Sequence, residues 1–489
     1  SSKDCNRNKY RMKKLPKGVN LRNAWWLFRQ VPIMKLSKIG KKFKKDPEKE
    51  KLNYIQVVKE DMARLKELET RGYNKEDGLH QYSHELFLSI MPSMELEMGL
   101  IFFIVLGTYK ALDKKRRDGK SEEIRSEYDA LCQGYEGDEL MEINIAMYRL
   151  ARKLDAGIWE EYDYDQLPQL SERIQMNVDG VLSDLPSDFV SEWSTFMENF
   201  GWDRADQMFI SSPSYRDDPV LLLSKLRQNV GTDVKDPAIT QQEQAAKRRQ
   251  VMQLHEERAA SKFTSSKSKV QKRNNIIEHL MWIRNAPKLH ISQMLGVLRM
   301  NILRAEEDLI AANRLEAKND IFHLDLEEVD NGLKDESYDL MAIVTPRKAI
   351  YERARKSNQC PILFDSRCRI LRPDPPSQED VEEGTLVGAA VSPGTATGRV
   401  RIVHSPNDCF ERGEVLAATV TNPNWTPLFV GASAVILQIG GALQHGALCA
   451  RELGKPAVSN IDIHNVLKTG MMVAVDGNAG TVKIVDEAD

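Results

Sequence analysis

Residues 440–458 read GGALQHGALCARELGKPAV, and this stretch decides how the C-terminal part of the chain is interpreted. A Gly-Gly turn leads to His445, which lies in the first turn of a helix predicted over 446–453. Gly454 is suited to end this helix, because glycine readily adopts the left-handed C-cap conformation, and Pro456 follows it. We expect an exposed imidazole at a helix N-terminus, where free N–H groups and the helix dipole favour phosphate. The alternative is a capping histidine without chemistry.

The same stretch resembles the phosphohistidine signature of the phosphoenolpyruvate-utilising (PEP-utilising) enzymes, in which two glycines, a histidine and an ARE-x-G-x-PAV string recur. The matching residues are Gly440, Gly441, His445, Gly446, Ala450, Arg451, Glu452, Gly454, Pro456, Ala457 and Val458. The resemblance implies that His445 carries a phosphoryl group. It assigns phosphate binding to Gly440, Gly441, Gly446 and Arg451. The family usually has Thr or Ser where this chain has Gln444.

The hydrophobic pattern changes from helical to strand-like at Thr385. Predicted strands are Leu386–Val391, Arg399–His404, Val415–Thr419, Ala434–Gln438, Met472–Val475 and Val482–Val485, with helices near His445 and His464. The segments Ser392–Val400 and Thr421–Phe429 also resemble the family. We therefore expect residues 385–489 to form a compact β/β/α swivelling phosphohistidine domain.

Residues 51–371 are predicted to form a large, mostly α-helical domain that binds the acceptor. The predicted fold class is therefore a multidomain α+β protein. Apolar residues recur at three- and four-residue spacing from Ile55 to Leu68, as on one face of a helix. Residues 372–384, RPDPPSQEDVEEG, combine prolines with acidic residues and are predicted to be a hinge linker.

A long charged helix is predicted over Gln241–Trp282, followed by Arg284 and Lys288. In the family an Arg and a Lys four residues apart face the phosphohistidine, and Asn285 replaces the usual Glu between them. Two adjacent cations suit a phosphoryl group that gathers charge in its transition state. Without the resemblance, such a pair is ordinarily a solvated helix face. Pro287 is expected to distort the helix.

Residues 201–219, GWDRADQMFISSPSYRDDP, resemble the acceptor-binding part of rifamycin phosphotransferase-like and PEP-synthase-like proteins through Gly201, Pro213 and Pro219. Tyr215 replaces a Trp. The family's Arg, Glu and Asp fall at Asp203, Gln207 and Phe209 in this chain. The identity of the acceptor is therefore open.

Residues 1–50 hold 16 basic and 4 acidic residues, although the whole chain has a net charge of -3. With Trp25, Trp26 and Phe28, this basic helical N-terminal segment could lie on an anionic membrane or on RNA. The favoured alternative is a helix whose aromatic face docks on the next domain and whose lysines face water, and no nucleic-acid-binding motif is present. The six scattered cysteines form no CxxC pair, so we expect no metal site and a cytoplasmic, reducing compartment.

The function implied by the resemblance is phosphotransfer of the dikinase type. His445 would take a phosphoryl group from ATP bound with Mg²⁺ in an ATP-grasp domain, which we expect upstream because no nucleotide loop is visible in the sequence. His445 would then pass the group to a small-molecule acceptor in the helical domain. The alternative is a binding or regulatory protein that kept the fold and lost the chemistry, favoured by Gln444, Asp203, Gln207 and Asn285.

Overall fold

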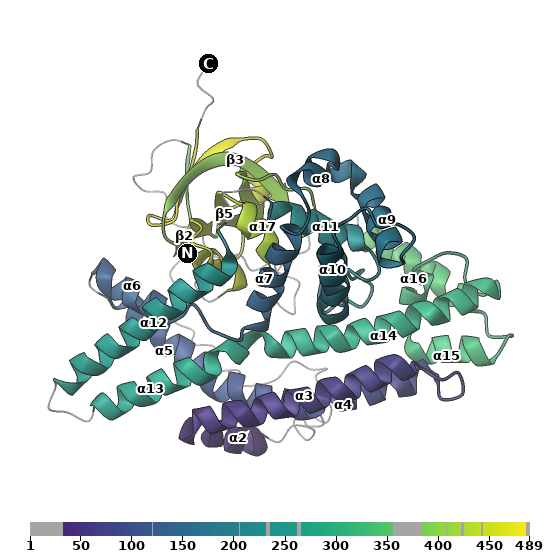
Figure 1. The fold of residues 1–489 in the computed structure, drawn as a ribbon, viewed down its shortest axis with the longest axis horizontal. Helices are drawn as coiled ribbons and strands as arrows, with labels where there is room; N and C mark the ends of the chain where they lie inside the picture. The colour runs from purple at the N-terminus through teal and green to yellow at the C-terminus, as the bar shows by residue number, and fades with distance from the viewer. Residues whose placement is uncertain are drawn as a thin grey trace, which may run out of the picture.

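The computed structural model describes most of the chain in two parts, a helical part and a C-terminal sheet domain (Figure 1). The described residues are 33–119, 121–204, 206–230, 235–261, 266–355, 384–406, 408–421, 425–441 and 444–485. The predicted hinge, 372–384, lies outside them except for its last residue, and so do Trp25, Trp26 and Phe28. The predicted fold class is confirmed.

The N-terminal helices form one layer of the helical part. They are α2 (Ile33–Lys45), α3 (Pro47–Arg71), α4 (Gly78–Leu100), the π-helical turn η1 (Ile101–Val105), α5 (Leu106–Arg117) and α6 (Glu122–Ala130). Asp46 caps α3 by accepting from the Lys49 N–H at 3.2 Å, and Gly72 ends it with φ of 68°. Because α3 begins at Pro47, the boundary placed after residue 50 falls inside a helix.

The described end of the basic segment, from residue 33, docks on the helical part, whereas docking through the aromatic residues stays a prediction. Helix α2 packs against α4 and buries Leu36 and Phe43. Its lysines Lys38, Lys41 and Lys44 are exposed to solvent.

Helices α4, η1 and α5 form one continuous 40-residue helix that is long and apolar enough by composition to cross a membrane. Here it packs against α2, α3 and the long helix α14 (Ala286–Ala311). Its side chains Leu86, Ile90, Leu100 and Ile104 are buried in the helical core. Neighbouring helices thus cover part of this apolar surface, while Phe87, Leu88 and Leu106 of the same helix are exposed.

The other helices of the helical part, besides α14, come after α6 in the chain. They are α7 (Glu139–Ala151), α8 (Ala156–Glu161), η2 (Tyr164–Gln166), α9 (Leu167–Val178), α10 (Ser187–Phe200), α11 (Pro219–Gln228), α12 (Pro237–Ala260), α13 (Ser266–Leu280), η3 (Met281–Asn285), η4 (Asp320–His323), α15 (Leu326–Lys334) and α16 (Leu340–Arg355). The single helix predicted over Gln241–Trp282 was wrong. The chain folds into two helices, α12 and α13, which pack against each other (Figure 1).

The C-terminal domain is built on one eight-stranded sheet in the order β1-β8-β7-β3-β4-β5-β6-β2. Its strands are β1 (Thr385–Val387), β2 (Ala389–Ser392), β3 (Thr395–Val403), β4 (Val415–Ala418), β5 (Ala434–Leu437), β6 (Ala457–Ser459), β7 (Met472–Asp476) and β8 (Thr481–Ile484). Strands β3 to β6 are parallel and the others pair antiparallel. The single strand predicted over Leu386–Val391 was wrong, because the chain forms β1 and β2 there, at opposite edges of the sheet. The other predicted strands are present, while β6 was missed because it is only three residues long.

Three short helices complete this domain: α17 (Thr426–Gly431), α18 (His445–Glu452) and α19 (Ile463–Val466). Helices α17 and α18 pack together, and α17 also packs against α11 of the helical part. Polar contacts join the two parts: Gln228 Nε2 donates to the Phe410 carbonyl at 2.6 Å, and Arg412 donates to the Val230 carbonyl at 3.1 Å. The C-terminal domain is therefore docked with α18 facing the helices.

Candidate active site

His445 begins α18, and the helix occupies the predicted position. Gly454 follows it with φ of 65°, as expected for a C-cap. The expectation of an exposed imidazole was wrong: part of the residue is accessible, but Nε2 is buried and has no hydrogen-bond partner. The reason is tertiary, because the docked helical domain covers the ring.

Arg284 and Lys288 lie beside this buried imidazole, although they do not share one helix. Arg284 belongs to the 3-10 turn η3, and Lys288 lies in the first turn of α14. Pro287 does not distort a helix here, because it occupies the first turn, where no backbone N–H is needed. Burial and the charges of Arg284 and Lys288 lower the pKa of His445 to about 3. The imidazole is therefore neutral at physiological pH and keeps a lone pair.

Arg284 is positioned by several neighbours. Its guanidinium donates to the Tyr109 hydroxyl and lies over the Tyr109 and Tyr135 rings, with its carbon 5.9 and 5.4 Å from their centroids. Its Nε is 3.6 Å from Asp138 Oδ2. Asp138 also caps α7 by accepting from the Leu140 N–H at 3.1 Å.

Asn285 holds the same carboxylate that Arg284 approaches. Its Nδ2 lies 3.2 Å from both oxygens of Asp138. Asn285, which replaces the family's Glu, thus orients Asp138. Sequence analysis missed Asp138, and only its position before the helix at 139 could have drawn attention to it.

The glycines of the predicted phosphate site have different surroundings. A Cβ on Gly446 would meet Thr421 Oγ1 at 2.6 Å and Leu437 Cδ1 at 2.7 Å, and one on Gly440 would meet Ser459 Cβ at 2.8 Å. A Cβ on Gly441 would meet nothing within 4 Å. Gly446 and Gly440 are therefore explained by close packing of α18 and its loop on the sheet.

Arg451 lies at the far end of α18 from His445. The six-residue separation corresponds to about 9 Å along a helix. Arg451 donates to the Val391 carbonyl at 3.2 Å, and Gln133 Nε2 donates to the Arg451 carbonyl at 3.2 Å. Burial lowers the pKa of Arg451, while Asp129 nearby opposes that shift. Its predicted role in phosphate binding stays a prediction.

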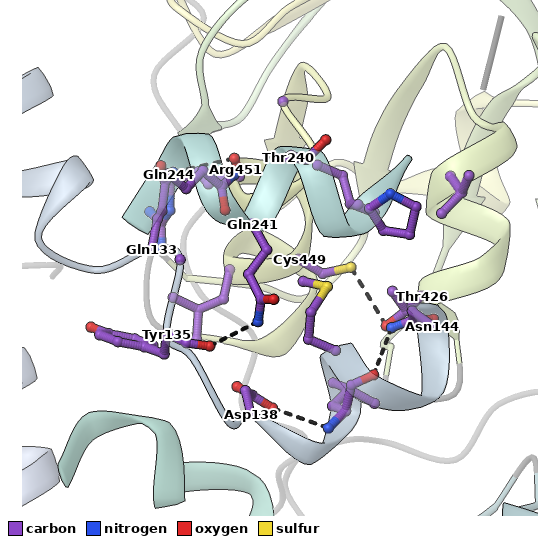
Figure 2. Close-up of a pocket in the computed structure, with 18 of the residues that line it drawn as sticks. Gln133, Tyr135, Asp138, Asn144, Thr240, Gln241, Gln244, Thr426, Cys449 and Arg451 are labelled. Atoms are coloured by element: carbon purple, nitrogen blue, oxygen red, sulfur yellow. Dashed lines mark hydrogen bonds between the residues drawn. The ribbon is translucent and has the colours of Figure 1, made fainter. Parts of the chain in front are cut away.

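A cavity of about 570 Å³ lies between the two domains along α18 (Figure 2). Its lining includes His445, Arg284 and Asp138 as well as Arg451. Gln241 Nε2 donates to the Tyr135 carbonyl at 3.0 Å. Cys449 is buried, with its Sγ 3.7 Å from Thr426 Oγ1, so it is a packed thiol at the cavity wall.

The 201–219 segment does not line this cavity. Asp203 and Gln207 are buried, and Gln207 Nε2 donates to Asp203 Oδ1 at 3.2 Å. Buried Lys225 donates to the Tyr215 hydroxyl at 2.8 Å, and burial lowers the pKa of Lys225 to about 8 although Asp203 opposes the shift. These residues form a structural network, while Phe209 is exposed.

Two family models match the chain. Residues 410–480 match the mobile domain of PEP-utilising enzymes, and residues 97–285 match the fourth domain of rifampicin phosphotransferase. The mobile domain contains His445, and the second match contains Asp138 and Arg284.

Curated relatives agree with both matches. Rifampicin phosphotransferase of Bacillus subtilis is 31% identical over 212 residues, 43% of this chain and 24% of that relative. Phosphoenolpyruvate synthase of Aeropyrum pernix is 42% identical over 114 residues, 22% of this chain and 14% of that relative. Among solved structures, aconitase X of Thermococcus kodakaraensis covers 21% of this chain at 21% identity with a TM-score of 0.19, too low to assign a fold.

The chain thus carries the mobile domain of the PEP-utilising enzymes beside a domain of the rifampicin phosphotransferase type. It is a relative of the phosphotransferases of that family. The match spans about a quarter of the length of the rifampicin phosphotransferases.

Proposed function

We propose that this chain is the acceptor-and-histidine part of a dikinase-type phosphotransferase. His445 takes a phosphoryl group that comes from ATP in a nucleotide-binding domain outside these 489 residues. The histidine domain then docks against the helical part, and the group passes to a small molecule in the cavity. The observation that carries this proposal is the buried, unpartnered Nε2 of His445 between Arg284 and Lys288.

The chemistry at His445 follows from its surroundings. A neutral imidazole has a lone pair on one nitrogen and can act as a nucleophile, whereas an imidazolium cannot. Arg284 offers a planar fork of donors and Lys288 a point charge. Both would stabilise the charge that gathers on the phosphoryl oxygens during transfer.

ATP and Mg²⁺ belong to the loading step, and we place neither in this chain. Among the described residues, no group of three or more His, Cys, Asp or Glu side chains could hold a metal ion. Loading of His445 and transfer from it are separate steps, and Arg284 and Lys288 act in the transfer.

The proposal is tested with ATP labelled separately at the β and γ positions. We expect acid-labile label on His445 from the β position in the full-length gene product and none in its His445→Ala variant. A full-length product without such label would contradict the proposal and favour a binding protein that lost the chemistry.

A further inference from the structure

The chemical groups that line the cavity beside His445 differ between its two ends. One end is lined by His445, by Arg284, whose charge acts on the imidazole, and by Asp138, whose Oδ2 lies 3.6 Å from Arg284 Nε. The other end lies beside Arg451, about 9 Å from His445 along α18, and beside Lys455, which follows the helix. A ligand that fills the cavity thus meets a reactive end and a basic end.

The side chains of the cavity are predominantly basic and amide-bearing. The basic residues are Lys235, Lys247, Arg284, Arg412, Arg451 and Lys455, whereas Asp138 and Glu243 are the two acidic ones among the described residues. Six carboxamide side chains also line it: Gln133, Asn144, Asn229, Gln241, Gln244 and Asn285. Most of these carboxamides donate to protein acceptors, as Gln133 does to the Arg451 carbonyl and Gln241 to the Tyr135 carbonyl. The excess of cations favours an anion.

Aromatic surface is scarce in the same lining. Tyr135 is the one aromatic residue among the described residues of the cavity. A site for a large apolar ligand is ordinarily lined by hydrophobic and aromatic side chains. Aliphatic side chains such as Leu140, Met141 and Leu448 share the wall with the cations and amides, so it is the excess of positive charge that indicates an anionic ligand.

We propose that the acceptor is a small hydroxyl-bearing anion. Its hydroxyl lies at His445, with Asp138 as the proton acceptor, and its anionic group points toward Arg451 and Lys455. This inference rests on the proposed function of His445 and specifies the substrate class of that site.

The transfer step balances with these groups. The acceptor oxygen forms a bond to phosphorus while the bond between phosphorus and His445 Nε2 breaks, and the electron pair of that bond returns to the imidazole. The hydroxyl proton passes to a carboxylate oxygen of Asp138 and later to solvent. The products are a phosphate monoester and neutral His445.

The substrate class is tested with phosphoryl-loaded protein and a fractionated small-molecule extract of the source cells. Potassium phosphoramidate, a chemical phosphoryl donor to imidazole, loads His445 without ATP, and the His445→Ala variant gives the background. The probes are the fraction retained by an anion exchanger and the neutral flow-through. We expect the retained fraction to discharge His445 at least tenfold faster than the flow-through.

Variants at the two ends of the cavity test the proposed roles of Asp138 and Lys455 separately. Asp138→Asn keeps the helix cap, because Asn and Asp cap equally well, but it cannot take the proton. We expect equal loading and discharge slower by about 10²-fold. Lys455→Glu should slow discharge at limiting extract by about tenfold, and Lys468→Glu, exposed and outside the cavity, should leave it unchanged.

The outcomes are distinguishable. If the neutral flow-through discharged His445 as fast as the retained fraction, the proposal that the acceptor is an anion would be overturned. If Asp138→Asn discharged as fast as the wild-type protein, the role of Asp138 as proton acceptor would be overturned. If neither fraction discharged the wild-type protein faster than buffer, this inference would fail. The proposed function would still be judged separately, by label from β-labelled ATP. If Asp138→Asn did not fold, Lys455→Glu would still decide the charge requirement.

Discussion

At the scale of single residues, the histidine loop is shaped by packing as much as by chemistry. Gly446 lies where a Cβ would meet Thr421 and Leu437, whereas Gly441, in the same loop, has open space around it. Alanine substitutions at these two glycines therefore make a matched pair of variants, one in a packed position and one in open space.

We predict that Gly446→Ala destabilises the chain by about 1–3 kcal/mol, because the extra methyl overpacks α18 against β5. Gly441→Ala should change the free energy of unfolding by less than about 0.5 kcal/mol, as substitutions in open space do. Urea unfolding monitored by circular dichroism measures both. Equal effects at the two positions would contradict the packing argument.

At the scale of elements, a buried ionic cluster ties α14 to its neighbours below the site. His290 Nδ1 of α14 is 2.7 Å from Glu97 Oε1 of α4, and its Nε2 is 3.4 Å from Glu139 Oε1 of α7. The Tyr54 hydroxyl of α3 donates to Glu97 at 2.8 Å. Asp138 directly precedes Glu139, and Lys288 lies two residues before His290. The cluster therefore holds together the two walls of the site that carry Asp138 and Lys288.

The cluster gives a pH-dependent contribution to stability. Burial opposes the charge on His290, but hydrogen bonds and charge interactions with Glu139 and Glu97 outweigh it and raise the pKa of His290 to about 10. Because the folded-state pKa is raised, the stabilisation is full below the unfolded pKa of about 6.5 and is lost as the pH rises through about 10.

We predict that His290→Gln costs about 3 kcal/mol near pH 6, since it leaves buried Glu97 without its cation, and costs less near pH 10. Urea unfolding of both proteins at several pH values gives this difference. A cost that does not fall with rising pH would show that His290 is not charged in the folded protein.

At the scale of the whole molecule, docking of the histidine domain controls the state of His445. The pKa of His445 is about 3 in the docked arrangement through burial and the two cations, against about 6.5 for a histidine in water. The docked arrangement therefore disfavours protonation of the His445 imidazole. The contribution of His445 to docking is full above about pH 6.5 and is lost as the pH falls from there toward 3.

We predict that acidification from pH 7.5 to pH 5 releases the histidine domain and enlarges the particle. Small-angle X-ray scattering of the full chain would record a larger radius of gyration. His445→Gln cannot titrate and should show a smaller change. An equal enlargement of the variant would assign the opening to other groups.

Much of the architecture was predictable from local signals. Strand-like runs with glycine turns after Thr385, and the helix between His445 and Gly454, follow from periodicity and capping. The break between α12 and α13 was missed because residues 260–266 contain no Pro or Gly, although the Ser and Thr residues clustered there favour a loop. Strand β6 was missed because three residues give no period.

The sequence by itself determined the classes of structure and the chemical groups available: a helical domain, a sheet domain and a histidine at a helix start, with Arg284 and Lys288 far from it in the chain. The tertiary structure alone decided that these three side chains meet, that the imidazole is buried and neutral, and that Asp138 joins them. The physical reason is that burial and charge interactions depend on distance in space. His445 comes to the same cavity as Asp138 and Arg284 of the helical part only because the two domains are docked.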